Sequence, residues 1–210
     1  MDYELLVNHE NPISLEYLNN VVIPNLEEVS FLRDNNDIFE EFKIANKKIF
    51  LERQTKIAFY KLRDFLNNQG INFDICSGFL SIENQGHKYN SFLERSGEEL
   101  TKIKMAIPGY SEHHTGLALD CDFYKNDDWT GICPLPDGNE NVETKYIHSI
   151  LPEFGFILRF PKDKTHVTRM QYEPWHIRYV GVELAKKLSS ENTTLEEYHK
   201  ELWEHKKHKR

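Results

Sequence analysis

Cysteine is scarce in this chain of 210 residues, and the three that occur, Cys76, Cys121 and Cys133, include no CxxC pair. An odd number without paired spacing argues against a disulfide framework and against a cysteine-rich zinc site. Cysteines that stay reduced fit a reducing compartment, so we expect a cytoplasmic protein. The opening residues MDYELLVNHENPIS agree, because they have neither the basic start nor the apolar stretch of a secretory signal.

Long apolar runs and an excess of positive charge are also missing. No stretch approaches the about 20 apolar residues that a membrane-spanning helix needs, so no membrane span is expected. The formal net charge is -8, and the dense basic run is confined to the tail HKKHKR, which we interpret as a frayed helix end. These features argue against a general nucleic-acid binder.

Repeats and low-complexity linkers are absent as well, so we expect one domain that spans residues 1–210. Helices are predicted within an N-terminal lead of about residues 1–45, over 45–68, 82–98 and 143–152, and in a C-terminal region of about 192–210 that contains the capping box TLEE. Strands are predicted over residues 71–76, 117–124, 155–160 and 175–180. This order is typical of an α+β fold, in which helices flank a small, mostly antiparallel sheet.

The stretch GYSEHHTGLALDCDF places two histidines just before a strand that contains acids. Alternate residues of that strand face the core, so Asp120 and Asp122 share the opposite face. That face and the preceding turn, with His113 and His114, could hold a ligand. The plain alternative is a strand with one solvated face and two surface histidines. Asp122 could orient a histidine or be a solvated acid.

A second stretch, YEPWHIRYVG, places Glu173 three residues before His176. Pro174 lacks the N–H that a strand interior needs, so Glu173 is expected in the turn before a strand and His176 within the strand. Both could then face one point. The alternative is a surface glutamate and a histidine packed against Trp175 or Tyr179.

Together the two stretches supply two imidazoles and one carboxylate: His113, Asp120 and His176. Catalytic zinc sites commonly have three protein ligands of these types, with water in the open position. Zinc lowers the pKa of that water, and a base must take its proton. Glu173 is the nearby candidate for this base. The parts are those of a zinc peptidase without the HExxH helix.

Both stretches also match motifs of a known family. SEHHTGLALD, residues 111–120, fits the pattern SxHxxGxAxD, and EPWH, residues 173–176, fits the ExWH element that follows it. Together they resemble the zinc D-Ala-D-Ala carboxypeptidases of the VanY type, and especially the bifunctional D,D-dipeptidase/D,D-carboxypeptidases called VanXY. The resemblance spans most of the chain, because other segments match in the same order: LLVNHENPIS, SGFLSIENQ, IPGYSEHH, GFILRFPKDK and TLEEYHKEL.

The resemblance implies a single zinc D,D-peptidase domain with a VanY/Hedgehog-like fold and zinc as its cofactor. It implies that the zinc ligands are His113, Asp120 and His176. Glu173 would be the general base, which activates water and then passes a proton to the leaving amine. Ser111 falls where the family's serine helps to hold the substrate's C-terminal carboxylate, and Gln85 falls where a glutamine lines the substrate site. The implied substrates are the free D-Ala-D-Ala dipeptide and the peptidoglycan precursor that ends in it, with a role in cell-wall metabolism or glycopeptide resistance.

One position departs from the family pattern. The segment SGFLS usually reads SGYRS, whose arginine stabilises the developing oxyanion and the substrate carbonyl, but this chain has Leu80 there. Losing one oxyanion donor typically costs about 100- to 1,000-fold in rate. Arg159 and Arg178 are candidates for a substitute, or else surface or structural arginines on strands, and Lys88 could reach the site from a helix. Two other functions therefore stay open: a weak or inactive homologue that binds zinc and a wall peptide, and an L,D-carboxypeptidase or endopeptidase.

Overall fold

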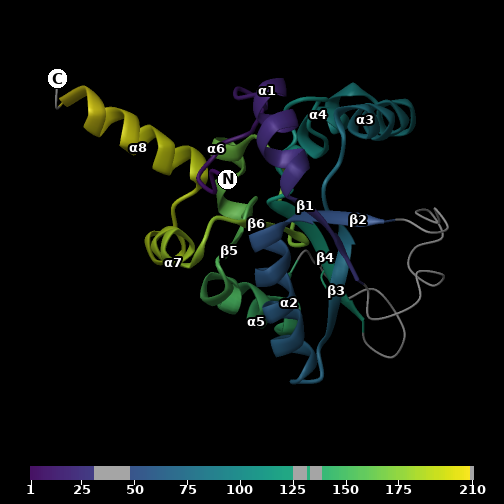
Figure 1. Cartoon of the computed structure of the whole chain (residues 1–210), viewed down its shortest axis with the longest axis vertical. Coiled ribbons are helices and arrows are strands. Elements are labelled where there is room, and N and C mark those ends of the chain that lie inside the picture. The colour runs from purple at the N-terminus through teal and green to yellow at the C-terminus, as the bar shows by residue number, and fades with distance from the viewer. Residues whose placement is uncertain (31–47, 125–131, 133–138, 209–210) are drawn as a thin grey trace.

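The computed structural model describes residues 1–30, 48–124, 132 and 139–208 (Figure 1). The strands are β1 (Leu26–Val29), β2 (Ile49–Glu52), β3 (Asn72–Ser77), β4 (Ala118–Tyr124), β5 (Phe156–Leu158) and β6 (His176–Tyr179). The α-helices are α1 (Leu15–Tyr17), α2 (Arg53–Asn67), α3 (Ile82–Ser96), α4 (Glu98–Lys104), α5 (Val142–Ile150), α6 (Thr165–Thr168), α7 (Val182–Glu191) and α8 (Leu195–His208).

The strands form two sheets, and neighbouring strands in both are antiparallel. β1 pairs with β2, and a larger sheet has the strand order β3-β4-β6-β5. Helix α2 packs against one face of the larger sheet (Figure 1), and its residues Phe59, Leu62 and Leu66 are fully buried there. The arrangement confirms the predicted α+β fold, in which helices flank a small antiparallel sheet.

Strand β4 has an apolar and a polar face, as its alternating sequence predicts. Leu119, Cys121 and Phe123 belong to the core beneath α2. Asp120 projects to the opposite face, because side chains alternate along a strand. The apolar face is therefore closed by α2, and the polar face is the one that can carry a site.

The helix predicted over residues 45–68 is wrong at its start. It begins only at Arg53, because Ile49–Glu52 forms strand β2, while residues 45–47 lie outside the described part. β2 forms because it pairs with β1. Pairing between segments that are distant in the sequence cannot be predicted from the spacing of apolar residues within one segment. Glu52 then caps α2 by accepting hydrogen bonds from two backbone N–H groups of its first turn.

The helix expected in the N-terminal lead is short and mixed. Residues 15–25 form an α-helical, a π-helical and a 3₁₀-helical turn in succession. Strand β1 follows, which the sequence did not predict. Residues 31–47 lie outside the described part, so the end of the lead near residue 45 stays a prediction.

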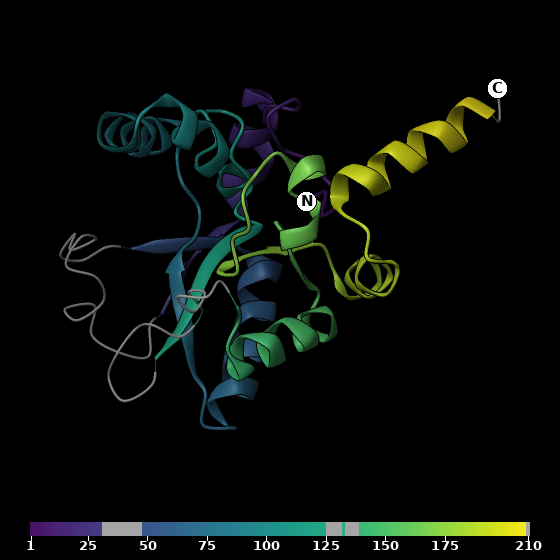
Figure 2. The ribbon, with the colours of Figure 1, turned by 180° about the vertical axis from the view of Figure 1, so that it is seen from behind.

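The C-terminal helix and its capping box are confirmed. The N–H of Thr194 donates to Oε2 of Glu197 at 2.9 Å, and the N–H of Glu197 donates to Oγ1 of Thr194 at 3.2 Å. Helix α8 begins there and extends away from the rest of the structure, with the C-terminal end at its tip (Figure 2). Residues 209 and 210 lie outside the described part.

Cys76 and Cys121 form no disulfide with each other, and Cys133 lies outside the described part. Within the described ranges, no helix combines the length and the apolar character that crossing a bilayer requires.

Candidate metal centre

The two sequence stretches meet because their strands are neighbours. β4 and β6 pair antiparallel, and the register sets Asp120 directly opposite His176. Residues that face each other in an antiparallel pair project to the same side of the sheet. The register therefore brings a carboxylate and an imidazole from distant parts of the chain to one point.

A short 3₁₀ turn, η4 (Glu112–Thr115), brings His113 to the same point. Ser111 caps the turn, because its Oγ accepts a hydrogen bond from the N–H of His113 at 3.3 Å. Gly116 ends the turn with a φ of +68°, and a Cβ at this position would lie 2.8 Å from Leu26. Glycine meets both demands, and the chain can enter β4 soon after the histidine.

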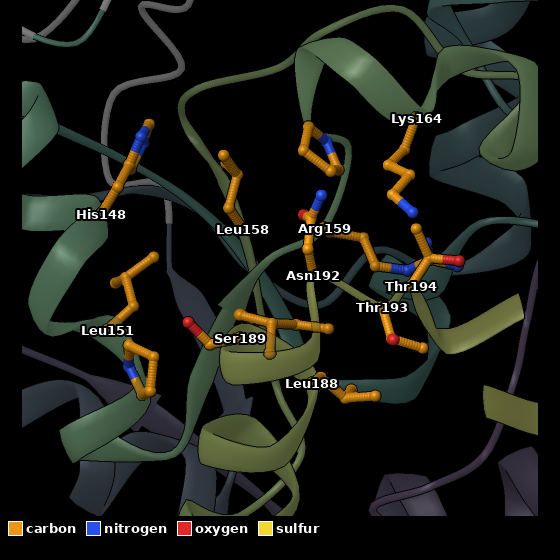
Figure 3. A pocket seen from close by; sticks show the side chains of 13 residues that line it. His148, Leu151, Leu158, Arg159, Lys164, Leu188, Ser189, Asn192, Thr193 and Thr194 are labelled. Carbon is orange, nitrogen blue, oxygen red and sulfur yellow. The ribbon is translucent and has the colours of Figure 1, made fainter. Parts of the chain in front are cut away.

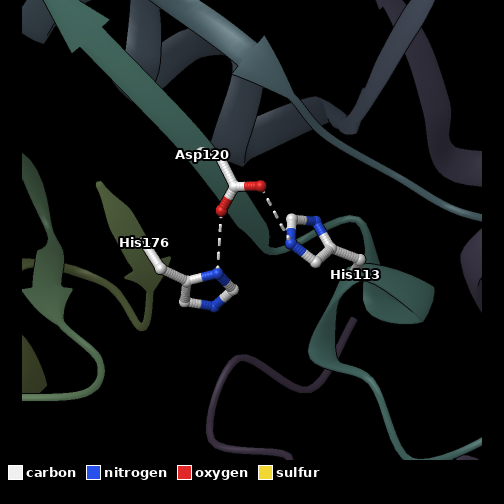
Figure 4. Close-up of side chains that lie close together, drawn as sticks. All are labelled: His113, Asp120 and His176. Atoms are coloured by element: carbon white, nitrogen blue, oxygen red, sulfur yellow. Dashed lines mark hydrogen bonds and ion pairs between the residues drawn. The ribbon is translucent and has the colours of Figure 1, made fainter. Parts of the chain in front are cut away.

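The three side chains converge, with Asp120 between the two histidines (Figure 4). Oδ1 of Asp120 lies 3.0 Å from Nδ1 of His176, and Oδ2 lies 3.5 Å from Nε2 of His113. One ligand atom from each residue lies within 4.8 Å of the other two, so the three residues can hold one metal ion. Two imidazoles and one carboxylate are ligand types that suit zinc.

The second nitrogen of each imidazole has a partner on the protein. Nδ1 of His113 donates to the carbonyl oxygen of Gly78 at 2.7 Å, since a carbonyl can only accept. Nε2 of His176 faces Oε2 of Glu112 at 3.4 Å. Each ring is therefore held by an acceptor on one nitrogen and offers the other nitrogen to the centre, as is typical of metal-binding histidines.

The carboxylate of Asp120 and the neighbouring histidines stabilise each other's charged forms. Burial would raise the pKa of Asp120, but the neighbouring His113 and His176 hold it well below its ordinary value. Burial lowers the pKa of His176, but hydrogen bonds to Asp120 and Glu112 outweigh this effect and raise it to about 10. A metal ion bound at Nδ1 of His176 would compete with a proton for this nitrogen.

His114 is a buried structural residue and is not part of the centre. It is fully buried, its Nδ1 donates to the carbonyl oxygen of Leu80 at 2.7 Å, and its Nε2 accepts from the N–H of Gly109 at 3.0 Å. Burial lowers its pKa, which keeps the ring neutral as this hydrogen-bond pattern requires. Both of its nitrogens have partners, and His113 is the histidine of this turn that joins the group able to hold a metal ion.

Glu173 lies in the segment before β6, as Pro174 predicts, and its side chain is buried beside the centre. Its Oε2 is 4.0 Å from Nδ1 of His176. Burial raises the pKa of the Glu173 carboxyl to about 7, although the charges of His176 and Lys104 act in the opposite direction. A carboxyl group with this pKa can both take and release a proton near neutral pH.

Ser111 and Gln85, the other predicted site residues, are held by internal hydrogen bonds. Ser111 is buried at the start of η4, and Gln85 is buried on α3, where its Nε2 donates to the carbonyl oxygen of Ala106 at 2.6 Å. Leu80 is 8% exposed, and its N–H donates to the carbonyl oxygen of His113 at 3.2 Å. The chain at position 80 thus runs directly against the turn that presents the histidine.

The two arginines considered as substitutes for the missing one are structural. Nε of Arg159 donates to Glu112 at 2.7 Å, and its two other nitrogens donate to Glu196. Nη1 of Arg178 donates to Glu112 at 2.8 Å, and its two other nitrogens donate to backbone carbonyls. Every guanidinium nitrogen of the two is committed inside the protein, so both are structural, as one alternative predicted, and neither is a surface residue. Arg178 lies on β6, whereas Arg159 directly follows β5.

Sequence reasoning missed Glu112, and it offered two roles for Asp122 that the structure does not support. Glu112 fills a variable position of the motif, so only its place beside His113 could have drawn attention to it. Asp122 is buried and its Oδ1 accepts the N–H groups of Phe123 and Ile132, each at 2.8 Å. It is therefore neither a solvated acid nor the acid that orients a histidine, but a backbone acceptor.

A separate pocket of about 200 Å³ lies between β5, α7 and the turn that leads into α8 (Figure 3). Leu158, Arg159, Asn192 and Thr193 are among its lining residues. Its walls bring together no group of histidines and carboxylates, and Arg159 is already committed to two glutamates. We therefore assign the chemistry to the centre formed by His113, Asp120 and His176, where titratable groups converge.

Comparison with known proteins identifies the family of the chain. The family model VanY, D-alanyl-D-alanine carboxypeptidase, matches residues 48–182. The bifunctional D-Ala-D-Ala dipeptidase and D-Ala-D-Ala carboxypeptidase VanXYC of Enterococcus gallinarum is 36% identical over 125 residues, which cover 60% of this chain and 65% of VanXYC. In three curated relatives the aligned stretch spans 59% to 69% of the relative's own length.

Two solved structures show the same fold. A mutant of the vancomycin resistance D,D-pentapeptidase VanY, in complex with Zn(II), is 25% identical with a TM-score of 0.72, and the match covers 94% of this chain and 99% of that one. The LD-carboxypeptidase LdcB is 28% identical with a TM-score of 0.71, and the match covers 93% and 84% of the two chains. Since the family model also matches more than half of the sequence, the chain belongs to the VanY family of D-alanyl-D-alanine carboxypeptidases.

Proposed function

We propose that the protein uses zinc to hydrolyse the terminal D-Ala-D-Ala peptide bond, in the free dipeptide, in the peptidoglycan precursor that ends in it, or in both. Its role would lie in cell-wall metabolism or glycopeptide resistance. The observation that supports this most is the convergence of His113, Asp120 and His176, with the buried Glu173 beside them. Similarity to VanXYC, whose name states both activities, supports the choice of substrates.

Zinc fits the donor set on its chemistry. Nε2 of His113, Nδ1 of His176 and the carboxylate of Asp120 face one another, and each ring's other nitrogen has an acceptor. The related VanY structure contains Zn(II). When bound, zinc would lower the pKa of a water molecule and polarise the substrate carbonyl.

Glu173 would move the proton during hydrolysis. It would take a proton from the water that attacks the carbonyl carbon of the last peptide bond. It would then deliver this proton to the nitrogen of the departing D-alanine as the C–N bond breaks. The pKa of about 7 that burial produces in Glu173 suits both halves of this transfer.

Ser111 and Gln85 would contact the substrate. The hydroxyl of Ser111 accepts a bond from His113 but keeps its own hydrogen, which could be donated to a substrate carboxylate. The amide of Gln85 uses one hydrogen on Ala106, so its oxygen and its second hydrogen have capacity for the peptide. Ser111 lies at the start of the turn that contains His113, and the side chains of both residues are fixed by these internal bonds.

A direct test measures zinc and released D-alanine on the same preparation. We expect about one zinc ion per chain, and D-alanine release from the D-Ala-D-Ala dipeptide, a pentapeptide ending in it, or both. His176→Ala should lose the zinc, because it removes one of three proposed ligands. A variant that keeps its zinc would disprove the ligand set, and a zinc-loaded wild type that releases no D-alanine would favour a binding homologue that does not cleave.

An L,D-carboxypeptidase is the second candidate, because the LdcB structure is as similar as the VanY structure. A tetrapeptide whose last bond joins an L-residue to D-alanine separates the two functions. Release of D-alanine from this tetrapeptide, without release from the dipeptide or the pentapeptide, would favour the L,D-activity.

Lys104 gives a prediction for the pH dependence. The N–H of Gln171 donates to the carbonyl oxygen of Ile103 at 2.9 Å, which holds the end of α4 beside the segment that contains Glu173. The positive charge of Lys104 favours ionised Glu173 and so lowers its pKa. In Lys104→Met the pKa of Glu173 should rise, and the acidic limb of kcat/KM should move to higher pH. Lys102→Met, which changes an exposed lysine two residues earlier on α4, is the matched control, and equal pH profiles for both variants would contradict the prediction.

A further inference from the structure

The two histidines of the centre are held by different kinds of acceptor. His113 is held by the neutral carbonyl of Gly78, whereas His176 faces the carboxylate of Glu112. We propose that Glu112 is a positioning residue, which holds the ring of His176 so that Nδ1 points at the metal. This inference rests on the metal site of the proposed function.

The two oxygens of Glu112 have separate tasks. Oε1 accepts from Nε of Arg159 at 2.7 Å and from Nη1 of Arg178 at 2.8 Å. Oε2 is the oxygen that faces Nε2 of His176 at 3.4 Å. A carboxylate needed only as a counter-ion for arginines would be satisfied through Oε1, so the position of Oε2 points to a role toward the histidine.

The arginines also place positive charge beside Glu112. Its side chain is 3% exposed, and two buried guanidinium groups contact its Oε1. A carboxylate that accepts the Nε2–H of a histidine fixes the ring and raises its basicity as a metal ligand.

Both arginines are fixed in turn by the two ends of the described chain. Arg159 donates to Glu196 in the first turn of α8, and Asn8 donates to the same glutamate at 3.1 Å. Arg178 donates to the carbonyl oxygen of Leu5 at 2.7 Å. The N-terminal lead and the start of α8 therefore fix the arginines that hold Glu112.

Zinc affinity tests the proposal, because a purely structural ion pair would not change it. Glu112→Gln is expected to weaken zinc binding by about 10- to 100-fold, the usual effect of removing an acceptor behind a ligand histidine. Glu196→Gln is the matched control, since it also removes a negative partner of Arg159 but does not face His176. The control should keep zinc affinity within about threefold of wild type, in a competition assay with a chelator.

A second variant covers the case in which Glu112→Gln does not fold. Glu112→Asp keeps the negative charge that the arginines need, but its shorter side chain withdraws an oxygen from His176. It should fold, as shown by its melting temperature without zinc, and still bind zinc more weakly than the control. Wild-type zinc affinity in a folded Glu112→Gln or Glu112→Asp protein would overturn the proposal, whereas a wild type that binds no zinc would instead overturn the metal site itself.

Discussion

Glutamine in place of Glu173 should slow D-alanine release by about 100- to 10,000-fold, the range that a positioned acid–base group contributes. The amide has nearly the size of the carboxylate but cannot take a proton from water. Glu173 is 7% exposed and lies 4.0 Å from Nδ1 of His176, so the substitution removes the base without opening the site. The measurement is kcat for the dipeptide or pentapeptide, whichever the wild type hydrolyses faster.

Zinc content separates loss of the base from loss of the metal. Glu173→Gln should keep the zinc of the wild type, because Glu173 is not one of the three proposed ligands. Glu183→Gln changes an exposed glutamate of α7 and should keep the wild-type rate, which makes it the matched control. A zinc-loaded Glu173→Gln protein with full activity would show that another group takes the proton.

Much of the centre could be predicted because its residues lie in two short motifs on neighbouring strands. The alternation of β4 is visible in the sequence and assigns Asp120 to the polar face. The proline before Trp175 places Glu173 outside β6, as observed. Only the register between β4 and β6, which sets Asp120 opposite His176, depends on pairing that local patterns do not reveal.

The charges behind the centre could not be predicted, because they connect residues far apart in the sequence. Arg159 and Arg178 reach Glu112 across 47 and 66 residues. Arginines on short strands look like surface residues in a sequence, and only the fold shows that their side chains are fully buried. Strands β1 and β2 were missed for the same reason, since each is defined by the other.

Several expectations stay predictions. These are the cytoplasmic location, the single domain over residues 1–210, the lack of nucleic-acid binding, and the substrate contacts of Ser111 and Gln85. The substrate contacts can be tested by substituting Ser111 or Gln85 and repeating the assays with the peptides above. Loss of a contact to the substrate carboxylate should raise KM more than it lowers kcat.

Position 80 offers a test of the proposed reaction. Leu80 stands where the resemblance implies an arginine, and Arg159 and Arg178 cannot take the place of that arginine because all their nitrogens are committed. The backbone at position 80 is nevertheless fixed beside the centre, through hydrogen bonds with His113 and His114. A side chain introduced there would start from a defined place beside the turn that contains His113.

Leu80→Arg should therefore raise kcat for D-alanine release, by as much as about 100- to 1,000-fold, the amount that one oxyanion donor contributes. The gain requires the guanidinium to reach the site, while its apolar stem occupies the nearly buried place of the leucine. Leu80→Met is the matched control, because it offers a flexible side chain of similar volume without a charge, and it should leave kcat near the wild-type value. Equal rates for the two variants, with melting temperatures showing both folded, would mean that this centre does not lack a donor at position 80. A rise confined to Leu80→Arg would instead show that the leucine keeps an otherwise complete centre slow.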